Sequence, residues 1–219
     1  MPSALPPQRD SAFATLRQFA RKRTPLERCE MCGRELAPEH EHLVEPANRK
    51  LICCCDACAI LFEGQSRTKY ERVPRRVLFL QDFKLTDGQW DSLMVPIEMA
   101  FFFKSTPHGK VIALYPSPAG PTESLLSLET WGDIELANPV LSQMEADVSA
   151  LLVNRIGHVR GAAPPEYYLA PIDECYKLVG LIRVHWRGLS GGAEVWHEIG
   201  AFFSALKKRA GIGREDAHA

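Results

Sequence analysis

The sequence predicts an α+β fold, in which a mostly antiparallel sheet packs against helices and a small cysteine-rich module precedes it. Three observations support this prediction. Short apolar runs bounded by Pro, Gly and Ser fill the middle of the chain, and long amphipathic segments dominate its last third. Six of the seven cysteines fall between residues 29 and 58, and the seventh stands alone at Cys175.

The composition limits the classes of function. The 219 residues are 46% hydrophobic and 24% charged, which suits one domain of ordinary size with a small appendage. A net charge of −1 and a pI near 6.7 argue against nucleic-acid binding. The charges are uneven, because residues 1–28 hold six Lys or Arg and two acids whereas residues 111–150 hold six acids and no Lys or Arg. We therefore expect a basic end and an acidic face.

Residues 1–25 are expected to form a tail with a short helix, because Phe13, Leu16 and Phe19 recur at helical spacing. No apolar run is long enough for a signal-peptide core or a membrane span. The cysteines are clustered rather than spread to close several loops, as a secreted disulfide scaffold would require. These features predict a reducing, cytoplasmic location.

The main domain is expected over residues 72–209, followed by a disordered tail at 210–219. Apolar runs predict strands at 76–80, 96–103, 110–116 and 123–131. Between the first two, residues 85–93 resemble a helical turn capped by Thr86 or Asp87.

Three helices are predicted in the C-terminal half of the chain. Residues 138–155 begin with an Asn cap and Pro in the first turn, and their apolar residues follow a helical period. Residues 171–186 have helical spacing as well, with a strand as the alternative for the second half. Residues 192–209 form an amphipathic pattern that ends in Lys207, Lys208 and Arg209, whose charges complement the helix dipole.

The cysteine-rich module spans residues 26–64 and contains two C-x2-C pairs, Cys29/Cys32 and Cys55/Cys58. A tetrahedral structural zinc ion needs four soft or borderline ligands, and one tight C-x2-C turn supplies two sulfurs on the same side. Gly33 follows the first pair and permits such a turn. Two pairs at this spacing strongly indicate a Zn²⁺ site held by all four cysteines.

The second pair differs from the first, because it lacks a glycine and runs directly into the apolar residues 59–62. This predicts a treble-clef-like site, with Cys55 and Cys58 on the first turn of a helix, rather than the two matching loops of a rubredoxin or zinc ribbon. Four thiolates around Zn²⁺ leave a net charge of −2, so hydrogen-bond donors are expected nearby. The candidates by sequence are Arg28, Arg34, Arg49 and Lys50.

Cys53, Cys54, His40 and His42 leave alternatives open. If residues 51–55 form a strand, Cys54 points away from Cys53 and is a small core residue. Cys53 could replace Cys55 as a ligand or join a shared cluster, which keeps iron or an iron–sulfur cluster open as the cofactor. The "HEH" segment at residues 40–42 reads as a polar loop, in which His42 could be a fourth ligand or a hydrogen-bond donor.

The sequence resembles an uncharacterised bacterial family of unknown function found in gene neighbourhoods of nickel–iron hydrogenases. The segments that carry the resemblance are residues 29–62 together with "PIEMAFFF", "ALYPSPAGPTES" and "PIDECYKLVGLIRVHWRGLSGG". In that family's pattern the second cysteine motif is C-x-C-x-x-C, which matches Cys53, Cys55 and Cys58. Cys54 occupies the middle position and departs from the pattern. The resemblance implies a cytoplasmic accessory or maturation role with a protein partner such as a hydrogenase component. It transfers no catalytic residue.

An enzymatic reading has weaker support. Asp173 and Glu174 precede Cys175 and would raise its pKa, so this thiol fits a core position better than a nucleophile. The Gly-rich loop 188–192 lacks the Lys-Ser/Thr of a P-loop and is better explained as a turn that needs positive φ. The sequence thus favours a zinc-binding accessory or interaction protein, with an iron–sulfur or rubredoxin-like electron carrier as the alternative.

Overall fold

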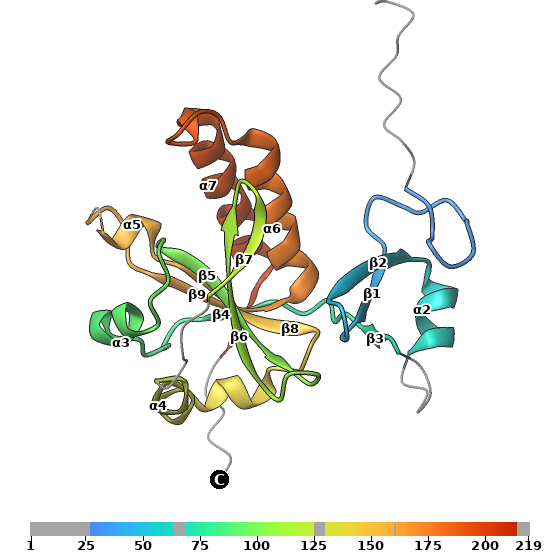
Figure 1. The fold of residues 1–219 in the computed structure, drawn as a ribbon, viewed down its shortest axis with the longest axis horizontal. Helices are drawn as coiled ribbons and strands as arrows, with labels where there is room; N and C mark the ends of the chain where they lie inside the picture. The colour runs from blue at the N-terminus through green and yellow to red at the C-terminus, as the bar shows by residue number, and fades with distance from the viewer. Residues whose placement is uncertain (1–26, 64–68, 125–129, 160, 214–219) are drawn as a thin grey trace, which may run out of the picture.

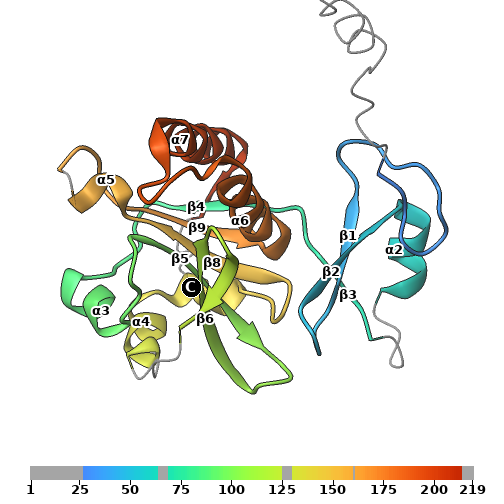
Figure 2. The same ribbon diagram turned by 45° about the horizontal axis from the view of Figure 1, so that its top comes forward.

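A small antiparallel sheet and a large, mostly antiparallel sheet organise the described part of the chain (Figure 1). The computed structural model describes residues 27–63, 69–124, 130–159 and 161–213. The small sheet has the strand order β2-β1-β3 and lies to one side, with helix α2 on its outer face (Figure 2). Its elements are β1 (Glu41–Glu45), β2 (Lys50–Cys54), α2 (Asp56–Phe62) and β3 (Glu71–Arg72).

The large sheet has seven strands in the order β10-β4-β9-β8-β5-β6-β7, and only the β10–β4 pair is parallel. The mostly antiparallel sheet predicted from the sequence is therefore confirmed. Its strands are β4 (Leu78–Leu80), β5 (Met99–Ser105), β6 (Lys110–Ser117), β7 (Gly120–Glu123), β8 (Ser149–Asn154), β9 (Glu166–Pro171) and β10 (Gly211–Gly213).

Helices cover both faces of the large sheet (Figure 1). On one face α6 (Ile172–His185) and α7 (Gly192–Arg209) pack together, as their amphipathic patterns predict. On the other face lie α3 (Asp87–Ser92), α4 (Trp131–Ala137) and the 3-10 helix η1 (Pro139–Gln143). The short α5 (Ile156–Val159) follows β8. The predicted cap of α3 is confirmed, because the Thr86 side chain accepts a hydrogen bond from the Gln89 N–H.

Strand β5 shows how the two cores are separated. Phe101 and Phe103 join the core beneath α6 and α7, whereas Phe102 joins the core beneath α3 and α4. Successive side chains of a strand point to opposite faces, so a strand between two helical layers must be apolar throughout. This requirement explains the unbroken "MAFFF" run.

The predicted helix at 138–155 is wrong. The segment contains the 3-10 turn η1 and then strand β8, which lies between β5 and β9. Residues 149–153 are all buried because both faces of this central strand are covered. A continuous apolar run satisfies a helical and a strand pattern equally well, and here pairing with two neighbouring strands decides between them.

Other segments also differ from the expectations. The strand expected at 123–131 is not formed as such: Glu123 ends β7, Trp131 begins α4, and residues 125–129 lie outside the described residues. Strand β9 was not expected. The short helix expected around Phe13 also lies outside the described residues. Where a disordered tail was expected, residues 211–213 pair with β4, and residues 214–219 lie outside the described part.

The small sheet is joined to the larger body by a shared core. Val44 of β1 and Val73, just after β3, belong to the same buried cluster as the apolar face of α6, and Leu51 of β2 packs against it. At the edge of this contact Arg49 pairs with Glu123 at 3.0 Å. One face of the small sheet thus faces the large domain, and the opposite face carries α2.

Candidate metal centre

The first cysteine pair lies on a tight turn that two backbone hydrogen bonds close. The Gly33 N–H donates to the Cys29 carbonyl and the Cys29 N–H donates to the Arg34 carbonyl, both at 2.8 Å. Gly33 has φ of +75°, a conformation that a residue with a Cβ adopts only at a cost. The glycine after the second cysteine therefore allows this turn, as the sequence predicts.

The second pair lies where β2 ends and α2 begins. Cys55 is the N-cap residue of α2 with φ −81° and ψ 160°, and Cys58 lies one turn into the helix. The predicted position of this pair at a helix start is confirmed. No side chain caps the helix, so the Cys55 thiol remains available to a metal ion.

The four cysteines converge on one point in space. The sulfur atoms of Cys29, Cys32, Cys55 and Cys58 all lie within 4.8 Å of one another. Cys32 Sγ and Cys55 Sγ are 3.7 Å apart and all cysteines are unbridged. Sulfurs placed about 2.3 Å from a tetrahedral zinc ion are about 3.8 Å apart, whereas a disulfide would bring them to about 2.05 Å. The donor set and its spacing therefore fit a tetrahedral metal ion.

Local electrostatics prepare one of these thiols to ionise. Burial by itself would raise the pKa of Cys29, but hydrogen bonds from the backbone N–H groups of Cys55, Cys32 and Met31 outweigh it and lower the pKa to about 6. Burial and hydrogen bonds to the other three thiols raise the pKa of Cys58. A thiolate at Cys29 is thus held by N–H and S–H donors, and a metal cation would supply the charge needed to ionise the rest.

Three of the four basic side chains predicted to donate to the sulfurs bind carboxylates instead. Arg28 pairs with Glu35 at 3.1 Å, Lys50 with Glu30 at 3.2 Å, and Arg49 with Glu123. At Cys29 the backbone N–H groups of Met31, Cys32 and Cys55 take the predicted role.

Glu30 links the turn that carries Cys29 and Cys32 to strand β2 through two hydrogen bonds. Its backbone N–H donates to the Cys53 carbonyl at 2.9 Å, and its carboxylate accepts from the Cys53 N–H at 3.0 Å. These paired bonds fix the position of Cys29 and Cys32 relative to Cys55 and Cys58. The site is therefore built by the backbone as well as by any bound ion.

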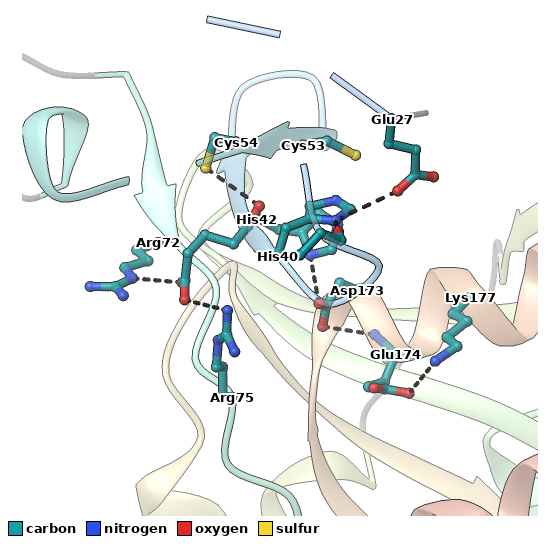
Figure 3. Close-up of polar contacts among 12 residues, drawn as sticks. Glu27, His40, His42, Cys53, Cys54, Arg72, Arg75, Asp173, Glu174 and Lys177 are labelled. Atoms are coloured by element: carbon teal, nitrogen blue, oxygen red, sulfur yellow. Dashed lines mark hydrogen bonds and ion pairs between the residues drawn. The ribbon is translucent and has the colours of Figure 1, made fainter. Parts of the chain in front are cut away.

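Cys54 and Cys53 lie on opposite faces of β2, as the alternation of a strand predicts (Figure 3). Cys54 is fully buried in the core under α2 and donates to the Glu41 carbonyl at 3.4 Å, and burial raises its pKa to about 12. It is a core residue. Cys53 and His42 lie on the face toward the large domain, and neither belongs to the four-cysteine group. The polar loop expected at residues 40–42 is wrong for Glu41 and His42, because these two residues begin β1 and pair with β2.

The structure also places Cys175 and the Gly-rich loop 188–192, on which the enzymatic reading depended. Cys175 is fully buried in α6, and burial and then the charges of Asp173 and Glu174 raise its pKa well above the usual value, so its core reading is confirmed. In the loop 188–192, Gly188, Gly191 and Gly192 all have positive φ, as expected for a turn that enters α7. Arg72 and Arg75, which follow the module, both pair with Glu41 of β1.

These features define an α+β protein with antiparallel sheets packed by helices and a small four-cysteine module that could hold a metal ion. The chain belongs to a family of unknown function, DUF5947, whose model matches residues 28–210. No curated protein and no solved structure matches it. In the part of the chain that the structure describes, no helix has both the length and the apolar character needed to cross a membrane.

Proposed function

We propose that this protein is a zinc-binding accessory protein in which Cys29, Cys32, Cys55 and Cys58 hold one structural Zn²⁺. The observation that carries the proposal is the convergence of four free thiols at the spacing of a tetrahedral tetrathiolate site. A closed site of four cysteines leaves no position for a substrate, which is typical of structural zinc. The ion would then maintain the shape of a surface rather than perform a reaction.

The proposed role of that surface is contact with a protein partner. Helix α2 begins at the metal site and presents Ile60 and Leu61 to solvent with 66% and 58% of their surfaces exposed. Adjacent exposed apolar side chains on a short helix favour a protein contact. We propose a cytoplasmic partner in the assembly or maturation of a metalloenzyme, such as a nickel–iron hydrogenase, which the resemblance of residues 29–62 suggests.

Elemental analysis and a visible spectrum of the anaerobically purified full chain test the metal. We expect zinc bound to the four cysteines and no visible absorption, because zinc tetrathiolate sites are colourless. Absence of any transition metal would contradict the proposal. Iron with visible absorption, with or without acid-labile sulfide, would instead establish the alternative of a rubredoxin-like or iron–sulfur electron-transfer protein.

Co-purification from native cells tests the partner. We expect hydrogenase components with the wild-type chain and their loss with Ile60→Asp, which retains all four cysteines. The matched control is Leu136→Asp in α4, which changes a side chain that is 83% exposed on another part of the surface. Equal recovery of partners by all three chains would exclude α2 as the contact.

A further inference from the structure

A second group of metal-binding side chains lies on the other face of the small sheet. One ring nitrogen of His40, one of His42 and the sulfur of Cys53 lie within 4.8 Å of one another. We propose that these three residues form a second metal site, separate from the four-cysteine site, which binds a divalent cation of borderline softness such as Zn²⁺ and leaves one coordination position open.

The backbone brings the three side chains together. His42 in β1 is paired directly with Cys53 in β2, and directly opposed residues of an antiparallel pair project to the same face. His40 lies two residues before His42 and therefore points to that face as well. The two imidazole rings have centroids 4.7 Å apart (Figure 3).

An ion-pair contact of His42 and a hydrogen bond of His40 hold the two rings. His42 Nδ1 lies 2.9 Å from Asp173 Oδ2, and His40 Nδ1 lies 2.9 Å from the Ala37 carbonyl oxygen. Both partners are acceptors, so a neutral ring that donates from Nδ1 leaves its Nε2 lone pair for a metal ion. A carboxylate or carbonyl that holds the Nδ1–H of a histidine is the usual support of a histidine ligand to metal.

The Nε2 atom of His40 provides an independent indication of a ligand. The His40 side chain is only 7% exposed, and its Nε2 is buried with no hydrogen-bond partner among the described residues. Burying a polar atom without a partner costs free energy, so such atoms usually have a ligand or an ordered water. A metal ion between the two histidines and Cys53 would satisfy it.

The site opens into a cavity of about 610 Å³ between the small sheet and α6. His40, His42 and Cys53 line one side of the cavity, and Asp173 and Lys177 line the other. Three protein ligands and an accessible fourth position are the pattern of zinc sites that exchange a water or an exogenous ligand. The open position is thus available to a small molecule or to a donor from a partner.

The two sites differ in location and charge. Cys54 is buried in the core under α2 with Cys29 and Cys58, whereas the Cys53 side chain points the opposite way and lines the cavity (Figure 3). Zn²⁺ with one thiolate and two neutral imidazoles carries a net charge of +1, against −2 for the tetrathiolate site. We therefore expect the second ion to bind more weakly and to exchange faster.

Zinc titration of the full chain against a chelator of intermediate affinity, with native mass spectrometry, tests the proposal. We expect two ions for the wild-type chain, and one for Cys53→Ser and for His42→Gln. The matched control is His185→Gln, because His185 Nδ1 is also 2.9 Å from a carboxylate, that of Glu194, yet it belongs to neither metal-binding group. This control should bind two ions.

Asp173→Asn keeps all three ligands and tests whether the Asp173 carboxylate helps His42 to bind the metal. We expect it to weaken binding of the second ion by about 10- to 100-fold and leave the first ion unchanged. Circular dichroism and the Co²⁺ spectrum of the four-cysteine site verify that each variant is folded. One ion at saturation in the wild-type chain, or two ions in both Cys53→Ser and His42→Gln, would overturn the proposal. Loss of both ions in folded Cys53→Ser would also overturn it, because Cys53 would then belong to the first site.

Discussion

At the residue scale, the position of each cysteine in its local structure decides its role. Cys53 and Cys54 are adjacent in sequence, yet one lines a cavity and the other is sealed in a core. Cys29 is buried like Cys54, but its pKa shifts in the opposite direction, because backbone N–H groups donate to its sulfur and lower its pKa. Proximity in sequence therefore does not determine the chemistry of a thiol in this protein. The direction in which the side chain points determines it.

We predict that Cys29→Ser releases the metal ion of the four-cysteine site and loosens the module. Metal binding supplies folding free energy on the order of 10 kcal/mol in isolated zinc fingers. Cys54→Ser is the matched control and should retain the ion at a cost of about 1–3 kcal/mol at most, because a hydroxyl can also donate to the Glu41 carbonyl. Elemental analysis and thermal unfolding measure both effects. If Cys54→Ser lost the ion while Cys55→Ser kept it, the ligand assignment would be wrong by one position.

At the element scale, turns and helix starts position the functional groups. The turn at Gly33 and the start of α2 each present two sulfurs together with backbone N–H groups. The loop before α7 uses glycines for a different purpose, since Gly191 is the N-cap of that helix with φ of +87°. A Cβ on Gly191 would also lie 2.8 Å from Val195 Cγ1.

We predict opposite effects for two glycine substitutions in the C-terminal helical pair. Gly191→Ala should destabilise the protein by more than about 1 kcal/mol, because it combines positive φ with a steric clash. Gly180→Ala should stabilise it by up to about 1 kcal/mol, because Gly180 is exposed within α6 and a Cβ there meets no atom within 4 Å. Urea unfolding of both variants measures the difference. Equal destabilisation would show that α6 needs its glycine for another reason.

At the scale of the whole molecule, the small sheet is a two-sided layer between the four-cysteine site and the large domain. Leu43, Ile52 and Cys54 pack toward α2, and Val44 packs into the core that includes α6. The His42–Asp173 contact crosses the same junction. The module and the domain therefore share packing, and the state of the module can affect the surface of the cavity.

We predict that the large domain stays folded when the metal is removed from the full chain. Two extensive cores on either side of the large sheet are formed mainly by its own strands and helices, whereas the cluster around the four cysteines is small. After treatment with a strong chelator, hydrogen exchange should stay slow in β5 and β8 and become fast in β1 and β2. The thermal midpoint should fall, because the shared contacts of Val44 weaken. Fast exchange throughout the chain would show that the two parts fold as one unit.

The sequence by itself predicted the fold class, the two cysteine pairs and the helices at 171–186 and 192–209. These features depend on local chemistry: C-x2-C spacing, a glycine that permits a tight turn, and apolar residues at a helical period. Only the tertiary structure showed that residues 149–154 form a central strand, because their apolar residues also fit a helical period and only pairing with β5 and β9 decides between the two. The group formed by His40, His42, Cys53 and Asp173 also required the structure. β1–β2 pairing and the packing of α6 against the small sheet bring these distant residues together, and neither is encoded in the spacing of any one segment.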